Sequence, residues 1–425
     1  MTSFCKKKRI SVPDQYYFRC QPTAKHAGFI RFGILLYVLF SVACSSKSEQ
    51  AQARQDALMV DSVSLLFSPQ DSAIKATQLD TFFRNLHKEH GFNGTVLIAQ
   101  YGKPIYQGAF GYKNFVSRDT LSLNTPFQLA SVSKQFTAVA IMQLQEKGLL
   151  SYDDSIQKFF PGFPYREITV RSLLTHRSGL PNYMYAFEKI IRDKNKPLTN
   201  AEVIDLFMKH KPGIYYLPNK KFNYSNTGYF LLAAIVEKIT GERFKNYVAN
   251  NIFKPAGMTH SFIFDGTNSS RVSQAATGYV GGRYIRPVTD NYYLEGVTGD
   301  KGVYSTVKDM YRWDRALYSG KILKDCTLEE AFTPKHHDLK TYANYGFGWR
   351  TYYAPGGEPL IFHAGWWHGF KTYFMRNLRD QSSVVILTNN ASNHCLSRIN
   401  IVQAILYPNR ANFYLHRADT TQIKE

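Results

Sequence analysis

The sequence predicts a fold of the α/β (α+β) class, with strands early and late in the body of the chain and helices between them. Three observations carry this prediction. Residues 94–100 and 103–112 form short strand-like runs. Apolar residues at helical spacing follow from residue 131, and strand-like runs return after residue 360. The chain of 425 residues, 44% of them hydrophobic, can bury the core of one large domain or two ordinary ones.

Residues 1–43 have the composition of a signal peptide. Seven basic residues precede an apolar run from Phe32 to Ala43, which is too short to span a bilayer comfortably. The run leads into Cys44 and a polar stretch, and so resembles a bacterial lipoprotein signal that is cut before Cys44. We therefore expect a lipid on Cys44 and a membrane-anchored protein of the cell envelope, facing the periplasm or the exterior. An uncleaved anchor and a mitochondrial presequence are the alternatives.

The chain is strongly basic, with 52 Lys and Arg against 32 Asp and Glu and a formal net charge of +20. A solvated basic surface is the simplest interpretation, and affinity for anionic envelope polymers or lipid headgroups is the alternative. The sequence contains no zinc-finger spacing, long basic helix or recognisable nucleic-acid-binding motif, so we expect no nucleic-acid partner.

The cysteines predict neither a disulfide framework nor a metal site. Of five cysteines, two lie in the leader and Cys44 is the expected lipid site, which leaves Cys326 and Cys395 in the body of the chain. Two separate buried thiols are the simpler interpretation, although the sequence alone leaves their pairing open. We expect no metal and no cofactor.

Ordered structure is expected to begin at Ala76. The preceding residues, 44–75, are rich in Ser, Gln, Asp and Ala and predict a flexible tether. Residues 76–90 then show apolar side chains on one face of a helix. The two strands that follow this helix are joined at Tyr101-Gly102, which predicts a tight turn between neighbours in a sheet.

Residues Ser131-Val132-Ser133-Lys134 open an amphipathic helix that Gly148 ends. Ser131 and Lys134 share a face at the start of this helix, where free backbone N–H groups and the helix dipole stabilise negative charge. The position suits a nucleophilic serine with a lysine base. The ordinary alternative is a Ser N-cap with a solvated Lys one turn on, which accounts well for other Ser-x-x-Lys sequences in this chain.

Three further segments carry candidate residues. Residues 168–181 predict a capped helix halted by Gly and Pro. Tyr224-Ser225-Asn226 lies on a short connection before an apolar helix, residues 230–239. His363-Ala364-Gly365 lies on a strand that begins at Leu360. The elements expected after it are two strands and a closing helix, at residues 369–375, 384–388 and 396–407.

Taken together and in this order, these motifs resemble those of the serine β-lactamase and penicillin-binding protein superfamily. The stretch Leu173 to Pro181 is similar to the class C β-lactamase-like branch, which also holds D-alanyl-D-alanine carboxypeptidases and esterases. The resemblance covers residues 76–407. It implies a β-lactamase/transpeptidase-like fold, an antiparallel sheet flanked by helices with an inserted helical lobe. Within a hydrolase domain of residues 76–425, the sheet lobe would comprise residues 76–130 and 297–425, and the helical lobe residues 131–296.

The resemblance also implies a mechanism through a covalent acyl-enzyme. Ser131 would attack a carbonyl carbon, and Lys134 and Tyr224 would exchange its proton. Asn226 would hold the substrate or the lysine. By the same analogy, the backbone N–H groups of Ser131 and Trp366 would bind the oxyanion.

Substrate binding is assigned by the resemblance to His363 and Gly365, with Trp366 and Arg350 as further candidates. His363 stands where many β-lactamases have Lys, and Ala364 stands where a hydroxyl is common, so two groups that attract a substrate carboxylate are missing. Arg350 is a candidate replacement, although an exposed strand arginine is an equal alternative. An aromatic rim and core packing both account for Trp366 and its neighbour.

The expected substrates are D-Ala-D-Ala-type peptides, β-lactams or small esters, and the resemblance leaves these three classes open. A catalytically silent binding protein of the same fold, which holds peptidoglycan or a peptide, is the alternative from another class.

Overall fold

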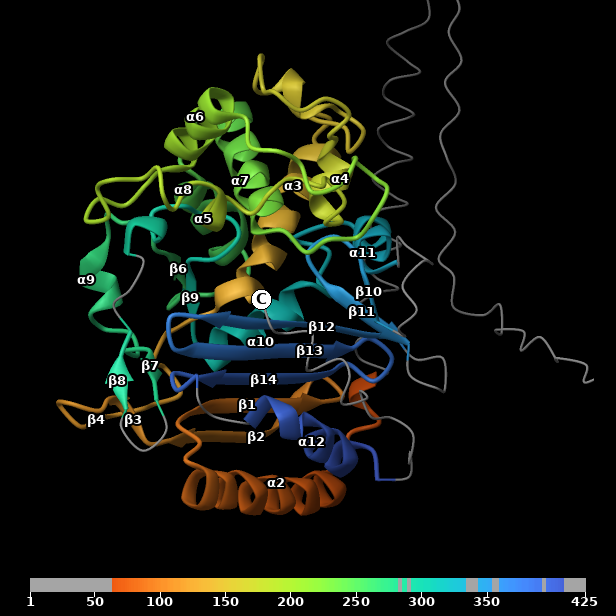
Figure 1. Ribbon diagram of the computed structural model, residues 1–425. Coiled ribbons are helices and arrows are strands. Elements are labelled where there is room, and N and C mark those ends of the chain that lie inside the picture. The colour runs from red at the N-terminus through yellow and green to blue at the C-terminus, as the bar shows by residue number, and fades with distance from the viewer. Residues whose placement is uncertain are drawn as a thin grey trace, which may run out of the picture. The chain divides into compact units, whose positions relative to one another are not determined.

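The computed structural model describes residues 63–281, 285–288, 292–333, 343–353, 359–391 and 395–408 (Figure 1). The expected signal peptide, Cys44 and residues 44–62 of the expected tether lie outside the described residues, so the predictions for them stay predictions. Within the described part of the chain, no helix is both long enough and apolar enough to cross a membrane.

A seven-stranded sheet forms the centre of the fold, in the order β10-β11-β12-β13-β14-β1-β2 (Figure 1). All neighbouring strands are antiparallel, which confirms the predicted fold class. Strand β1 lies beside β14, with Gly94 opposite Thr388, so the two ends of the ordered region meet inside one sheet. The strands are β1 Gly94–Gln100, β2 Lys103–Phe110, β10 Ala343–Tyr345, β11 Arg350–Tyr353, β12 Pro359–Trp367, β13 Phe370–Asn377 and β14 Ser382–Thr388.

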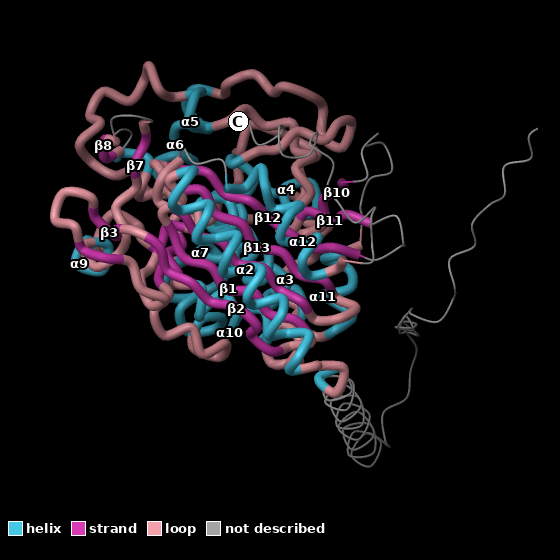
Figure 2. The backbone as a smooth tube through the Cα atoms, turned by 90° about the horizontal axis from the view of Figure 1, so that it is seen from below, coloured by secondary structure: helices cyan, strands magenta, loops and turns pink. Residues whose placement is uncertain are grey.

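Helices cover both faces of this sheet, and strand β1 shows the result. Its Val96 and Ile98 pack in one buried cluster with helices α2 (Pro69–His90) and α12 (Ile399–Leu406). Its Leu97 and Ala99 alternate with them and join the other cluster, on the opposite face. Because both faces are covered, all seven residues of β1 are buried. Figure 2 shows α2 lying across the strands.

The first helix corrects the predicted boundary of the tether. Helix α2 begins at Pro69 rather than at Ala76. Ser68 is its N-cap, since the Ser68 hydroxyl accepts a hydrogen bond from the Asp71 backbone N–H at 3.3 Å. Proline is well suited to the first helical position because its N–H would have no partner there. The capping signal lies in a polar stretch, before the apolar pattern on which the prediction rested.

The middle of the chain is mainly helical. Short strands form three smaller sheets beside it: β3 Tyr112–Asn114 with β4 Asp119–Thr120, β5 Phe127–Gln128 with β9 Val303–Ser305 and β6 Phe262–Ile263, and β7 Tyr279–Val280 with β8 Arg286–Pro287. The remaining helices are α3 Lys134–Glu146, α4 Val170–Leu174, α5 Tyr183–Ala186, α6 Asn200–His210, α7 Asn226–Thr240, α8 Phe244–Val248, α9 Ser269–Val272, α10 Val307–Ala316 and α11 Asp325–Phe332.

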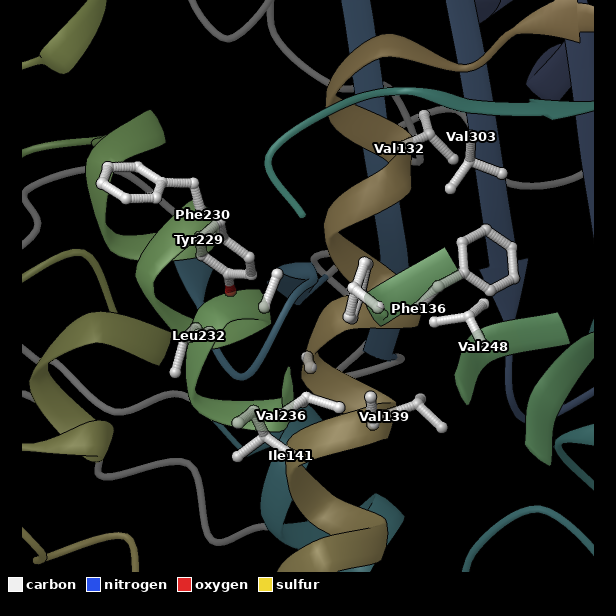
Figure 3. Packing of buried hydrophobic residues seen from close by; sticks show 14 of the residues in the cluster. Val132, Phe136, Val139, Ile141, Tyr229, Phe230, Leu232, Val236, Val248 and Val303 are labelled. Atoms are coloured by element: carbon white, nitrogen blue, oxygen red, sulfur yellow. The ribbon is translucent and has the colours of Figure 1, made fainter. Parts of the chain in front are cut away.

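Helix α3 is the buried axis of this half of the molecule. Its residues 134–144 are all buried, which is why its pattern of apolar residues is broader than a single stripe. Figure 3 shows Phe136 and Val139 in the cluster with Tyr229 and Val236 of α7. Each large side chain buried here contributes about 1.5–3 kcal/mol to stability. The packing therefore fixes the position of the N-terminal end of α3, where Ser131 and Lys134 lie.

Candidate active site

Ser131 lies on a tight turn rather than in the first turn of an α-helix. Residues 130–133 form a 3₁₀ turn, and helix α3 begins at Lys134, three residues later than predicted. The cause is local, because Ala130 has a φ of +51°, in the left-handed region that non-glycine residues rarely adopt. Such a conformation costs about 1–3 kcal/mol and persists only where surrounding contacts hold it. Ser133 supplies one such contact, since its Oγ accepts a hydrogen bond from the Val303 backbone N–H at 3.1 Å.

Lys134 is fully buried and directed at Ser131. Its Nζ donates to Ser131 Oγ at 3.1 Å, to Asn226 Oδ1 at 2.7 Å and to the Asp300 carbonyl oxygen at 2.9 Å. A buried ammonium is tolerated only with partners of this kind, so the three acceptors fix the position of the lysine. The first and second predicted motifs are therefore joined directly, by the bond from Lys134 to Asn226.

The ring of Tyr224 lies among basic side chains. Lys134 Nζ is 4.9 Å from its ring centroid, and the Arg350 guanidinium carbon is 5.5 Å away. The ring of His176 lies against it, tilted by 36°, with a centroid distance of 4.2 Å. The Arg350 guanidinium also lies 6.0 Å from the ring of Tyr345. Ser131 and Tyr224 thus both contact Lys134. Arg350 contacts the ring of Tyr224 as well.

His363 is buried, and both of its ring nitrogens have partners. Nδ1 donates to the Ala364 carbonyl oxygen at 2.7 Å, and Nε2 accepts from the Tyr345 hydroxyl at 3.0 Å. Burial, with the positive charges of Arg350 and Lys134, lowers the pKa of His363 well below its ordinary value. The imidazole is therefore neutral at pH 7. Its predicted contact with substrate stays a prediction, and the observed role of the ring is to hold Tyr345 beside Tyr224.

Gly365 allows a close approach between β12 and the Ser131 turn. A Cβ at this position would lie 2.3 Å from the Leu129 carbonyl oxygen and 2.4 Å from Thr372 Oγ1. The Thr372 hydroxyl already donates to that same carbonyl at 2.7 Å. Glycine is therefore required here because the backbone of the Ser131 turn occupies the space of a side chain. The predicted contact of Gly365 with substrate stays a prediction.

We expect Gly365→Ala to destabilise the protein by about 1–3 kcal/mol, because the added methyl group forces the turn away from β12. The same shift displaces Ser131, so covalent labelling of the serine slows. Denaturant unfolding and the rate of labelling measure the two effects. Gly213→Ala is the matched control, since nothing lies within 4 Å of a Cβ there. Equal stability of both variants would contradict the close approach.

A second buried histidine, His176, supports the same cluster. Its Nδ1 accepts a hydrogen bond from the Ser225 backbone N–H at 3.0 Å. Burial, followed by the charges of Lys134 and His363, lowers the pKa of His176 well below its ordinary value. It lies within the stretch that carries the family resemblance, yet no pattern in the sequence indicates that its ring lies against Tyr224.

The two histidines predict acid lability. Below about pH 6.5 the unfolded chain binds protons that the folded His176 and His363 exclude, so stability falls as the pH falls. Each histidine contributes a slope of about 1.4 kcal/mol per pH unit until its lowered pKa is reached. Denaturant unfolding between pH 7.5 and 5.5 measures the slope. We expect His363→Gln to reduce the slope of the unfolding free energy against pH by about 1.4 kcal/mol per pH unit. An unchanged slope would contradict a neutral, buried His363.

A small cavity of about 60 Å³ opens beside Ser131. Asn226 and Trp366 line it, as predicted for substrate contacts, and Trp366 is 47% exposed at its edge. Tyr224 contacts Lys134, which contacts Ser131, and Arg350 contacts Tyr224. Neither Tyr224 nor Arg350 is part of the lining. The lining residues are Ser131, Asn182, Met184, Tyr185, Asn226, Asp300, Lys301, Trp366 and Trp367.

Sequence reasoning missed the adjacent pair Asp300 and Lys301. The Asp300 carbonyl holds Lys134, and both side chains are almost completely buried in the cavity wall. Tyr183 joins them, donating to Asp300 Oδ2 at 2.9 Å and accepting from Lys301 Nζ at 2.7 Å. The available signal was two opposite charges between glycines in an otherwise apolar stretch.

Within the described residues, no group of three or more His, Cys, Asp or Glu side chains is arranged to hold a metal ion. Cys326 is a free thiol.

Comparison with known proteins agrees with this geometry. The chain matches the model of the Beta-lactamase family over residues 79–404. It is 38% identical over 325 residues to penicillin-binding protein 4* of Bacillus subtilis (strain 168), covering 74% of this chain and 72% of that protein. The octameric penicillin-binding protein homologue from Pyrococcus abyssi is similar in structure, with a TM-score of 0.69, 27% identity and 79% of each chain covered. The penicillin-binding protein from Bacillus halodurans has a TM-score of 0.65 and 27% identity, covering 76% of this chain and 97% of that one.

Proposed function

Because this chain belongs to the Beta-lactamase family of hydrolases, we propose that it hydrolyses its substrate through a covalent acyl-enzyme on Ser131. The observation that carries the proposal is the contact between Lys134 Nζ and Ser131 Oγ at 3.1 Å, in the wall of a cavity. A nucleophile and a base within hydrogen-bonding reach, with the base itself held by further groups, are what serine acylation requires. Here Asn226 and the Asp300 carbonyl hold the base.

The proposed steps use these groups in order. Ser131 Oγ attacks the substrate carbonyl carbon while the lysine amine, in its unprotonated form, takes the hydroxyl proton. The backbone N–H groups of Ser131 and Trp366 bind the oxyanion. As the bond between the carbonyl carbon and the leaving group breaks, Tyr224 gives its hydroxyl proton to the leaving group, and Lys134 passes the serine proton on to Tyr224, which restores both groups. A water molecule then attacks the acyl-enzyme and gives one proton to the same pair, and the pair returns a proton to Ser131 Oγ as the acyl bond breaks and the acid leaves.

The proposed substrates are D-Ala-D-Ala-type peptides, β-lactams or small esters in the cell envelope. The name of the Bacillus subtilis relative supports the penicillin-like classes. The exposed Trp366 and Tyr185 beside the cavity favour apolar acyl or alcohol groups. The envelope location, with a lipid on Cys44, rests on the signal-like leader alone.

A substrate panel tests this proposal with the purified mature protein. Nitrocefin, a D-Ala-D-Ala peptide and p-nitrophenyl esters sample the three classes, and a fluorophosphonate probe reports on the serine independently of substrate choice. We expect turnover of at least one class together with labelling of Ser131. Turnover of the esters alone would remove the peptide and β-lactam classes. Absence of both turnover and labelling would overturn the hydrolase and favour a silent binding protein of the same fold.

A further inference from the structure

The cavity beside Ser131 has a buried cation in its wall. Among the described residues that line it, Lys301 is the only lysine or arginine. Its side chain is 4% exposed, so it is not one of the solvated surface lysines that make the chain basic. A charge this deeply buried is costly unless it is well paired, so its partners indicate what it does.

Lys301 has fewer close acceptors than its ammonium group can use. Nζ carries three N–H donors, and among the described residues only the Tyr183 hydroxyl accepts one at short range, 2.7 Å. The Val297 carbonyl and Asp300 Oδ1 each lie at 3.5 Å, where a hydrogen bond is weak. Lys134, the other lysine of the site, has three acceptors within 3.1 Å. The spare donor capacity therefore lies with Lys301.

The two carboxylates near Lys301 are held by other donors. Tyr183 donates to Asp300 Oδ2. Glu295 accepts from Trp367 Nε1 at 2.5 Å and from Gln128 Nε2 at 2.9 Å, and His368 Nδ1 lies 2.8 Å from it. Burial opposes the charge of Glu295, but these contacts and Lys301 hold its pKa below the ordinary value. The short hydrogen bonds of both carboxylates therefore come from other donors, and Lys301 adds an ion pair with Asp300 at 3.5 Å and a favourable charge near Glu295.

Arg350, the cation that the sequence singled out, does not serve this cavity. Its guanidinium lies over the rings of Tyr224 and Tyr345, and it is absent from the lining. Lys301 instead lies 5.3 Å from the ring of Trp367, which lines the cavity with Ser131.

We propose that Lys301 forms an anion subsite in the cavity wall and selects substrates whose acyl part carries a carboxylate. The proposal rests on the proposed acyl-transfer function of Ser131. The carboxylate takes the place of the two long contacts and accepts from Nζ, while Tyr183 continues to hold the ammonium in position. The volume of about 60 Å³ exceeds the roughly 10–15 Å³ that one water molecule needs, so the anionic group fits while the rest of the acyl part extends past Trp366.

Two matched esters test this subsite. N-succinyl- and N-succinamoyl-D-alanine p-nitrophenyl esters share a leaving group and differ in a single carboxylate. We expect the wild type to prefer the succinyl ester by about tenfold in kcat/KM, and Lys301→Met to lose most of this preference. The readout is the ratio of the two kcat/KM values for one enzyme, so a general loss of activity in Lys301→Met, which removes the partner of Asp300 and Tyr183, does not count for or against the subsite.

Protection of Ser131 from the fluorophosphonate probe gives a second readout that needs no turnover. We expect N-succinyl-D-alanine to protect at about tenfold lower concentration than N-succinamoyl-D-alanine, in the wild type only. Lys196→Met is the matched control, because Lys196 pairs with Glu202 at the surface. If Lys301→Met does not fold, Lys301→Gln is read in the same way, since its amide can still donate to Tyr183.

The outcomes separate this inference from the proposed function. A labelled Ser131 with equal preference for both esters and equal protection by both acids overturns the anion subsite and leaves the hydrolase intact. A Lys301→Met variant that keeps the wild-type preference does the same. Absence of labelling in the wild type overturns the hydrolase, and with it the acyl subsite.

Discussion

Ser131→Ala is expected to abolish covalent labelling by a fluorescent penicillin and by a fluorophosphonate, and to lower hydrolysis at least about 10³-fold. The reason is that Lys134 Nζ contacts the Ser131 hydroxyl at 3.1 Å, while its other two acceptors are the amide oxygen of Asn226 and the carbonyl oxygen of Asp300, which are not nucleophiles. The fold should be unaffected, because this hydroxyl lies at the cavity rather than in the core. Gel fluorescence and intact-protein mass measure the label.

Ser133→Ala is the matched control, two residues further along the same turn. Ser133 is buried, and its Oγ accepts from the Val303 backbone N–H instead of facing the cavity. We expect this variant to be labelled like the wild type, with a loss of stability of about 1 kcal/mol from the missing hydrogen bond. Undiminished labelling of Ser131→Ala would sink the assignment of the nucleophile.

Replacement of Lys134 should be nearly as damaging. Lys134→Met removes the base, and Lys134→Arg keeps the positive charge on a group that stays protonated at pH 7. We expect acylation of Ser131 to slow at least about 10³-fold in both variants. Lys134→Met also leaves Asn226 Oδ1 and the Asp300 carbonyl without their donor, which costs about 1–3 kcal/mol each.

Rapid-quench labelling and denaturant unfolding separate the chemical effect from the structural one. Lys158→Met is the matched control, because Lys158 occurs in another Ser-x-x-Lys sequence and is exposed beside Asp154. It should acylate normally. Acylation of Lys134→Arg at close to the wild-type rate would show that the lysine is not the base and would transfer this role to Tyr224.

The local parts of the site could be predicted from the sequence because short-range structure fixes them. Ser131 and Lys134 are three residues apart at the start of a helix, and their contact follows from that spacing. Asn226 begins the apolar helix α7, and the packing of α7 against α3 brings it to the lysine. The pairing of β1 with β2 followed in the same way from the tight turn at Tyr101-Gly102, whereas the antiparallel sheet as a whole was implied by the family resemblance.

The surroundings of His363 depend on residues that the sequence does not connect to it. Its burial and its neutral state arise from Tyr345 and from Arg350, which lie on neighbouring segments of the sheet. A histidine on a strand edge has the same sequence signature whether it faces a substrate or a tyrosine. The pairing of β11 with β12, in which Arg350 lies opposite Phe362, decides whether His363 faces a substrate or a tyrosine.

The Asp300 loop was unpredictable for a related reason. A Cβ on Gly299 would lie 2.5 Å from the Tyr229 carbonyl oxygen, so the loop is pressed against helix α7. That contact joins residues 70 positions apart in the sequence, and no periodic pattern marks it. The same contact places the Asp300 carbonyl oxygen beside Lys134. It also places Lys301 in the wall of the cavity.

The pairing of β1 with β14 sets the order of events during synthesis. Strand β1 leaves the ribosome long before β14, and at about 5–20 residues per second the interval is roughly 15–60 s. Throughout that time β1 has β2 on one side and an unpaired edge on the other. The sheet can close only when the last strand arrives, so folding is governed by contacts of long sequence separation and is slow. We therefore expect the hairpin of β1 and β2 to be prone to edge-to-edge aggregation until β14 covers its open side.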